Sequence, residues 1–166
     1  MTVNLSTGGA TGEGTDTLYY IENIAGSAQS DTLIGDGNAN TISGNGGNDT
    51  LYGGDGLDVL WGNAGADTFV FESASAFNNV DQIKDLSTAQ SDAIDISDVL
   101  DGYFNAGTDD ITDFVQIVTN GSDSELYVDT TGSATFGSSQ HIATIFGVTG
   151  LTDEAALVTA GTLIAA

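Results

Sequence analysis

The stretch GNGGNDTLYGGDGLDVLWGNAGADTFVF, residues 44–71, decides the fold of this chain. It combines frequent glycine with a regular pattern in which an acidic residue or asparagine stands two residues before a large apolar residue. The pattern begins upstream of this stretch, and its consecutive pairs are spaced nine residues apart. The pairs are Glu22/Ile24, Asp31/Leu33, Asn40/Ile42, Asp49/Leu51, Asp58/Leu60 and Asp67/Phe69. Because a fixed period of this kind is typical of repeat architectures, the sequence predicts a solenoid.

Each nine-residue unit divides into a strand and a turn. The large apolar residue lies in a short strand, where its side chain points inward and stacks on the equivalent residues of neighbouring coils. The glycine-rich half forms a tight turn that needs positive φ angles, which glycine adopts at little cost. Two units make one coil, so successive turns lie on alternate edges of the solenoid. The predicted fold is therefore mainly all-β: a parallel β-roll of nonapeptide repeats, followed by a β-rich C-terminal domain with a short helix.

Turns that are one coil apart become neighbours in such a roll. Asp31, Asp49 and Asp67 line one edge, and Asn40 and Asp58 line the other. A Ca²⁺ ion between two neighbouring turns can take a side-chain oxygen from each and complete its shell with backbone carbonyls, so we expect about three ions in the roll. The Asn40 site is the weakest because asparagine is neutral. The predicted metal-site residues are Asp31, Asn40, Gly44, Gly46, Gly47, Asn48, Asp49, Gly53, Gly54, Asp55, Gly56, Asp58, Gly62, Ala64, Gly65 and Asp67.

The charge of the chain is strongly negative, with 24 acidic residues against one basic residue and a formal net charge of -23. This excludes nucleic acid as a natural partner, because no cationic surface is available for phosphate. The charge fits either a solvated acidic surface or bound Ca²⁺. There is no cysteine for disulfides or thiolate sites. The apolar runs are too short to span a bilayer, so we expect no membrane insertion.

The repeat resembles a known family. Its units read G-G-x-G-x-D-x-U-x, with U a large apolar residue, which is the pattern of the Ca²⁺-binding β-roll of RTX (repeats-in-toxin) proteins. Residues 23–71 resemble such a roll, and GTDTLYYIEN (14–23) resembles the segment that caps it. Gln29 and Asn38 depart from the pattern where glycine is usual, so the first two turns are degenerate. Residues 81–104 resemble the C-terminal target domain of proteins exported by type I secretion, and residues 109–132 and 141–150 continue the match to the ends of large surface adhesins.

This resemblance implies a division into an N-terminal cap (1–22), the Ca²⁺-binding roll (23–71) and a type I secretion target domain (72–166). It implies a non-catalytic C-terminal module of a secreted bacterial RTX protein, most of all a large adhesin, that carries an uncleaved export signal and folds on extracellular Ca²⁺. Its implied partners are the secretion machinery and upstream domains of the same chain, and we expect a monomer, secreted or at the cell surface. The alternatives are the secretion tail of an extracellular protease or polysaccharide-degrading enzyme, or a surface-binding or ice-binding module in its own right.

The second half of the chain shows ordinary strand and helix patterns. Apolar runs at 114–118 and 126–128 flank a turn sequence and predict a hairpin, and HIATIFGV (141–148) predicts a further strand. A short capped helix is expected at 152–160, before Gly161, and a last strand is expected at 162–166.

Three further groups of side chains have roles that depend on the fold. Asp92, Asp95, Asp98 and Asp101 fit a strand running into a turn, and they form either an additional Ca²⁺ site or solvated acids that cap a helix. The outward-facing ladder Ile34, Tyr52 and Val70 is apolar enough that we expect the C-terminal half or a partner to cover it. His141 is the single histidine, and no nucleophile lies near it in sequence, so we predict no catalytic activity.

Overall fold

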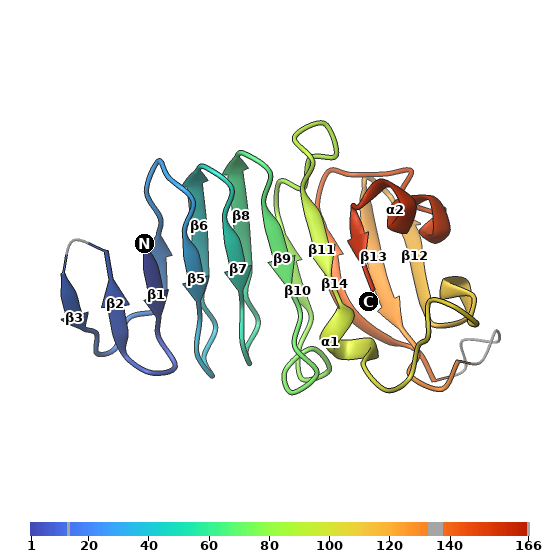
Figure 1. Ribbon diagram of the computed structural model, residues 1–166, viewed down its shortest axis with the longest axis horizontal. Coiled ribbons are helices and arrows are strands. Elements are labelled where there is room, and N and C mark those ends of the chain that lie inside the picture. Colours follow the sequence, from blue (N-terminus) through green and yellow to red (C-terminus); the bar gives the residue numbers. More distant parts are fainter. Residues whose placement is uncertain (13, 133–137, 166) are drawn as a thin grey trace.

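The computed structural model describes residues 1–12, 14–132 and 138–165. Two β-sheets form an elongated body, with the N-terminal strands at one end and the two main helices and the last strands at the other (Figure 1). The first sheet has the order β15-β11-β9-β7-β5-β1-β2-β3 and the second β12-β13-β14-β10-β8-β6-β4. The first sheet comprises β15 (Leu163–Ile164), β11 (Ala93–Asp95), β9 (Thr68–Val70), β7 (Thr50–Tyr52), β5 (Thr32–Ile34), β1 (Thr2–Asn4), β2 (Gly9–Thr11) and β3 (Thr15–Thr17). The second comprises β12 (Val115–Asn120), β13 (Asp123–Val128), β14 (Gln140–Ile145), β10 (Asp81–Ile83), β8 (Val59–Ala64), β6 (Thr41–Gly46) and β4 (Asn23–Ala25).

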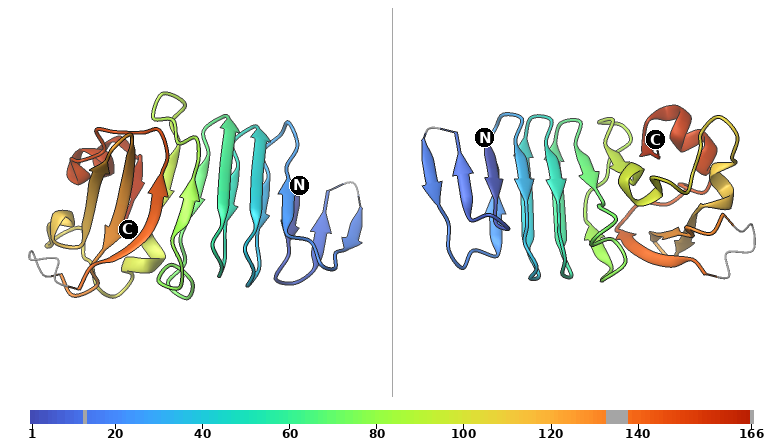
Figure 2. Two further views of the ribbon diagram at one scale, coloured as in Figure 1. Left: turned by 180° about the vertical axis from the view of Figure 1, so that it is seen from behind. Right: turned by 60° about the horizontal axis from the view of Figure 1, so that its bottom comes forward.

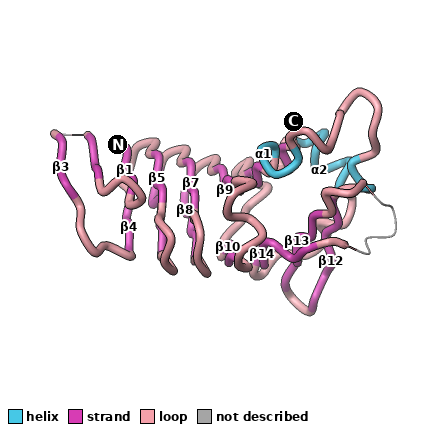
Figure 3. Tube along the Cα trace, turned by 90° about the horizontal axis from the view of Figure 1, so that it is seen from below, coloured by secondary structure: helices cyan, strands magenta, loops and turns pink. Residues whose placement is uncertain are grey.

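The roll is built as the nine-residue period predicts. Strands one coil apart pair in parallel and in register, so that Leu33 lies beside Leu51 and Leu51 beside Phe69. Seen from below, the chain passes from one sheet to the other with each turn (Figure 3). The large apolar residue of every unit is at most 5% exposed, so these side chains form the core between the sheets. The predicted fold class is confirmed.

Coil stacking continues beyond the last nonapeptide. The strand β10 pairs in parallel with β8, and β11 pairs in parallel with β9. Ile83 and Ile94 take the inward positions and are 0% and 2% exposed. Further on, β14 pairs with β10 and β15 with β11, again in parallel. The two sheets and a single core cluster therefore run from the roll into the C-terminal part, while the domain boundaries remain a prediction.

The C-terminal elements follow the sequence pattern closely. The predicted hairpin is formed by β12 and β13, and the predicted strand is β14, which pairs antiparallel with β13 (Figure 2). The predicted helix is α2 (Glu154–Ala160), which begins two residues later than expected. The Asp153 side chain caps it by accepting a hydrogen bond from the Ala156 amide, and Gly161 ends it with φ 78°. β15 is the expected last strand, and Ala166 lies outside the described residues.

Two short helical segments precede β12. The α1 helix (Ser97–Leu100) follows β11, so the segment expected to be a strand and turn is a strand followed by one helical turn. The 3-10 helix η1 (Ile111–Asp113) is capped by Asp110, which accepts a hydrogen bond from the Thr112 amide. None of the helices in the described ranges has the length and apolar character needed to cross a membrane.

The N-terminal strands complete the first sheet. β1 stacks in parallel on β5, whereas β2 and β3 continue outward as antiparallel strands. Tyr19 and Tyr20, in the predicted cap, are exposed. Of the outward apolar ladder, Ile34 and Tyr52 are half-buried and line a hollow together with residues 72, 74 and 75. The segment that follows the roll thus lies beside part of the ladder, and its cover over the ladder stays a prediction.

Candidate metal-binding turns

Aspartates on one edge of the roll are joined by a ladder of hydrogen bonds. The Asp31 amide donates to Asp49 Oδ1 at 2.8 Å, and the Asp49 amide donates to Asp67 Oδ1 at 2.9 Å. The Asp67 amide donates in the same way to Asp92 Oδ1 at 3.0 Å. We call these four residues the first column. The carboxylates of Asp49, Asp67 and Asp92 are thereby held against the backbone of the preceding coil, and all four residues are buried.

The opposite edge carries a second column made of Asn40, Asp58 and Asp81. The Asn40 amide donates to Asp58 Oδ1 at 2.7 Å, and the Asp58 amide donates to Asp81 Oδ1 at 3.0 Å. The structure therefore groups the predicted side-chain ligands into the two edges that the repeat implies.

Asp81 and Asp92 extend the columns although they were not among the predicted site residues. Asp92 is one of the four aspartates that the sequence assigns either to an additional Ca²⁺ site or to solvated acids that cap a helix. A signal for both was present, because Asp81-Gln82-Ile83 and Asp92-Ala93-Ile94 repeat the aspartate-any-apolar triplet of the roll. The loops before them are longer than those in the repeat, so the fixed nine-residue spacing did not identify them.

Three carboxylates in the columns each have one oxygen without a partner. Oδ2 of Asp49, Asp58 and Asp67 is buried and has no hydrogen bond within the described residues. The outer members differ, because Asp31 Oδ2 accepts from the Ser27 amide and Asp92 Oδ2 from the Ser87 amide. Burial of an unpaired carboxylate oxygen is costly. A cation is the partner that these three oxygens lack.

Glycine creates the space that these oxygens face. A Cβ atom on Gly44 would lie 2.3 Å from Asp49 Oδ2 and 2.9 Å from the carbonyl oxygen of Gly62, in the next coil. On Gly53 and on Gly62 it would lie 2.5 Å from the Oδ2 of the aspartate in the same turn. The turns thus bring carboxylate and carbonyl oxygens together, and these hard oxygen ligands suit Ca²⁺.

The remaining predicted turn residues shape and connect the turns. Positive φ angles occur at Gly47, Gly54, Gly56 and Gly65. Asn48 Oδ1 accepts from the Ala66 amide one coil away, and the carbonyl of Ala64 accepts from the Gly47 amide. Gly46 pairs with Ala64 in the second sheet, and Asp55 is exposed and accepts from the Asn78 side chain. Which of these residues ligate an ion stays a prediction.

No protein cation neutralises the columns beyond their N-terminal end. The single ion pair in the described part of the chain joins the Met1 amino group to Asp31. Lys84 Nζ lies over the ring of Phe146, 3.3 Å from its centroid, in a cation–π contact. No three histidine or acidic side chains within the described ranges cluster tightly enough to hold a metal ion. An ion in the turns therefore needs backbone carbonyls as well as carboxylates.

Burial and mutual repulsion raise the pKa of several column carboxyls. Burial, reinforced by the charges of Asp36 and Asp55, raises the pKa of Asp58 to about 6. Burial raises the pKa of Asp67 to about 6 and of Asp81 to about 7, with neighbouring carboxylates adding to both shifts. The charged form of these groups is thus disfavoured as long as no cation accompanies it.

These shifts predict that protons and calcium compete for the columns. Without metal, the folded chain binds more protons than the unfolded chain above pH 4, so its free energy of unfolding falls as the pH rises towards 7. Calcium affinity must rise over the same range, because Ca²⁺ binds the deprotonated groups. For a chain that is already folded, a carboxyl with a pKa of about 6 lowers the affinity ~4-fold at pH 5.5 relative to pH 8. Calorimetric titration of the folded chain at the two pH values checks this, and an affinity independent of pH would contradict it.

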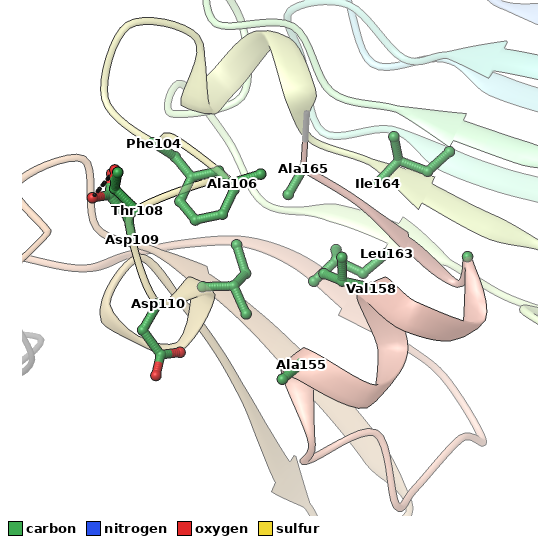
Figure 4. A pocket seen from close by; sticks show the side chains of 12 residues that line it. Phe104, Ala106, Thr108, Asp109, Asp110, Ala155, Val158, Leu163, Ile164 and Ala165 are labelled. Atoms are coloured by element: carbon green, nitrogen blue, oxygen red, sulfur yellow. Dashed lines mark hydrogen bonds between the residues drawn. The ribbon is translucent and has the colours of Figure 1, made fainter.

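A separate hollow of about 590 Å³ lies at the C-terminal end, between the 104–111 segment and α2 with β15 (Figure 4). Its walls are mainly apolar, with Phe104, Val158 and Leu163 among them. The carboxylates at its rim cap local turns, since Asp109 accepts from the Asn105 amide and Asp110 from Thr112. His141 lies elsewhere, stacked on Tyr127. The hollow therefore brings together no set of groups suited to acid–base or nucleophilic chemistry.

Fold and site together define a parallel β-roll with oxygen-rich, glycine-lined turns. The family model of the RTX calcium-binding nonapeptide repeat matches residues 19–51 and 43–73. This part of the chain is accordingly an array of RTX calcium-binding nonapeptide repeats. Among solved structures, the solution structure of the AlgE6R3 subunit of the Azotobacter vinelandii mannuronan C5-epimerase is similar, with 29% identity and a TM-score of 0.54. The match covers 86% of this chain and 76% of that one. No curated protein matches the chain.

Proposed function

We propose that this chain is a non-catalytic module that folds when Ca²⁺ binds between the turns of its roll. The observation that carries the proposal is the buried, unpartnered Oδ2 of Asp49, Asp58 and Asp67. Each lies beside a glycine in its own turn, where a cation can bind it together with carbonyl oxygens. About three ions fit the roll: between the Asp31 and Asp49 turns, the Asp49 and Asp67 turns, and the Asn40 and Asp58 turns.

Calcium supplies the charge that the folded chain lacks. The chain has a formal net charge of -23, so folding into a compact state without cations brings like charges together. Where Ca²⁺ is scarce, as in cytosol, the chain stays expanded. Where Ca²⁺ reaches millimolar levels, sites of modest affinity fill, and the free energy of binding becomes free energy of folding.

This behaviour suits the C-terminal module of a secreted bacterial RTX protein, most of all a large adhesin. An expanded chain can be threaded through a type I secretion channel, and folding outside the cell would then oppose its return. The resemblance of residues 81–104 and of the later segments to secretion target domains supports this role. Fusion of the chain to a reporter in a bacterium with a type I exporter tests it. Failure to export the fusion would argue against the secretion role while leaving calcium-dependent folding intact.

A second candidate is the repeat subunit of an extracellular enzyme, with the chemistry carried by other domains. The similarity to a subunit of a mannuronan C5-epimerase favours it. Binding of the isolated chain to an acidic polysaccharide such as alginate, measured by calorimetry in Ca²⁺, would support this candidate. Absence of binding would favour the adhesin role.

Calcium withdrawal is expected to unfold the roll. In excess chelator the far-ultraviolet circular dichroism spectrum should lose its β-sheet signal, because the column carboxylates beyond Asp31 lose the cations that offset their charge. Addition of millimolar Ca²⁺ should restore it, whereas equal Mg²⁺ should not, since Mg²⁺ demands a stricter octahedral shell. An unchanged β-sheet spectrum in chelator would overturn the proposal.

A further inference from the structure

The first column does not end at the last nonapeptide turn. Its final member, Asp92, belongs to the segment 85–92, which stacks on the 62–67 turn as though it were one more coil. This segment lies outside the residues that match the repeat family model, which end at residue 73. The junction between turn 62–67 and segment 85–92 is therefore not a nonapeptide site.

An additional carboxylate enters this junction. Continued two residues beyond β10, the pairing of β8 with β10 places Asp85 opposite Gly62. Gly62 lies opposite Gly44, and Gly44 opposite Gly26, in the same way, so Asp85 takes the position of the first glycine of each repeat. Its Oδ1 accepts from the Gly62 amide at 2.9 Å, and its Oδ2 accepts from the Asn63 amide at 2.8 Å. A carboxylate has about four acceptor positions, so two remain on Asp85. An acidic side chain thus stands where the repeat has glycine.

A second carboxylate points at the same glycine. Asp67 is 0% exposed, its Oδ2 has no hydrogen bond to any described residue, and that oxygen would lie 2.5 Å from a Cβ atom on Gly62. Carboxylates from two successive coils therefore converge on Gly62. Asp92 holds this arrangement by accepting from the Asp67 amide at 3.0 Å.

The local basic residue does not offset these charges. Lys84 is adjacent to Asp85 in sequence, but its ammonium group lies over the ring of Phe146. Gln90 also contacts the turn: it accepts from the Gly65 amide and donates to the Asn63 carbonyl. Gln90 closes one side of the turn with hydrogen bonds and supplies no countercharge.

We propose that a further Ca²⁺ ion binds between turn 62–67 and segment 85–92, with Asp67 and Asp85 as its carboxylate ligands. Asp92 acts as a positioning residue, and backbone carbonyls of the two segments complete the shell. The inference rests on the proposed calcium-dependent folding. This ion joins the roll to the C-terminal part of the sheets, so calcium binding organises β10 and β11 together with the nonapeptide coils.

The test compares Asp85→Asn with Asp101→Asn in the full chain. Both changes remove one negative charge, and Asp101 is an exposed residue outside both columns. Native mass spectrometry in Ca²⁺ should count one ion fewer for Asp85→Asn than for the wild type, and the wild-type number for Asp101→Asn. An equal count and equal calorimetric affinities in all three proteins would overturn the proposal.

A measurement on the wild type keeps the test valid if Asp85→Asn does not fold. The single tryptophan, Trp61, precedes Gly62 and can sensitise Tb³⁺ luminescence near the site. Gd³⁺ at the same position should broaden the amide NMR signals of Ser87 and Gln90 strongly. Sharp signals for both residues at saturating Gd³⁺ would also overturn the proposal. A wild type that folds without any Ca²⁺ would instead refute the proposed function, so the two failures are distinguishable.

Discussion

Replacement of Gly65 by alanine is expected to destabilise the calcium-bound roll strongly. Gly65 has φ 140°, a conformation that residues with a side chain rarely adopt. A Cβ atom there would lie 1.7 Å from the carbonyl oxygen of Gly47, in the preceding coil, and 2.6 Å from its carbonyl carbon. Backbone atoms cannot rotate away as a flexible side chain can, so the two coils would have to separate. We expect a loss of about 3 kcal/mol or more in the free energy of unfolding.

Urea titration in saturating Ca²⁺, followed by circular dichroism, measures this loss. The matched control is Gly37→Ala, in another turn of the same roll. Apart from Gly37 itself and its two chain neighbours, no atom of the described residues lies within 4 Å of a Cβ atom at this position, and its φ is not positive. The control should change the free energy of unfolding by less than about 0.5 kcal/mol. Equal stability of the two variants would show that contact between coils at Gly65 does not maintain the fold.

The roll could be predicted from the sequence because each repeat carries its own local structural signals. Each nonapeptide specifies its own turn through glycine and its own inward side chain through the apolar residue. Neighbouring coils then repeat that geometry in register, as Leu33, Leu51 and Phe69 do. The hairpin and α2 were predictable for a related reason, because turn residues and the Asp153 cap act over a few positions.

The extension of the columns depends on contacts between residues that are distant in sequence. Asp81 and Asp92 take their places because β10 and β11 pair with β8 and β9, across loops of irregular length. Asp85 lies near Asp67 for the same reason, although nothing in its immediate sequence marks it as a ligand. The cation–π contact of Lys84 likewise depends on tertiary packing, because the pairing of β14 with β10 brings Phe146 next to its ammonium group. Regular spacing identifies the sites within the repeat, whereas tertiary packing determines how far the two columns continue beyond it.

Substitution of Asp67 by asparagine is expected to raise the Ca²⁺ concentration needed for folding by roughly tenfold or more. Asparagine keeps an oxygen that can accept from the Asp49 amide, so the hydrogen-bond ladder survives while the charge is lost. Asp67 faces both the Asp49 turn and segment 85–92, so two ions lose a charged ligand. The metal-free fold should become more stable, because a buried carboxylate with a pKa of about 6 no longer has to be accommodated without a cation.

The reciprocal change, Asn40→Asp, provides the matched comparison. Asn40 is the neutral member of the second column, is buried, and accepts from the Asp36 amide through Oδ1, a bond that aspartate can also form. Asn40→Asp should lower the Ca²⁺ midpoint of folding and destabilise the metal-free state, which is opposite to Asp67→Asn in both respects. Calcium titrations followed by circular dichroism measure both midpoints. Midpoints that shift in the same direction would show that hydrogen bonding, and not charge, determines how these turns bind calcium.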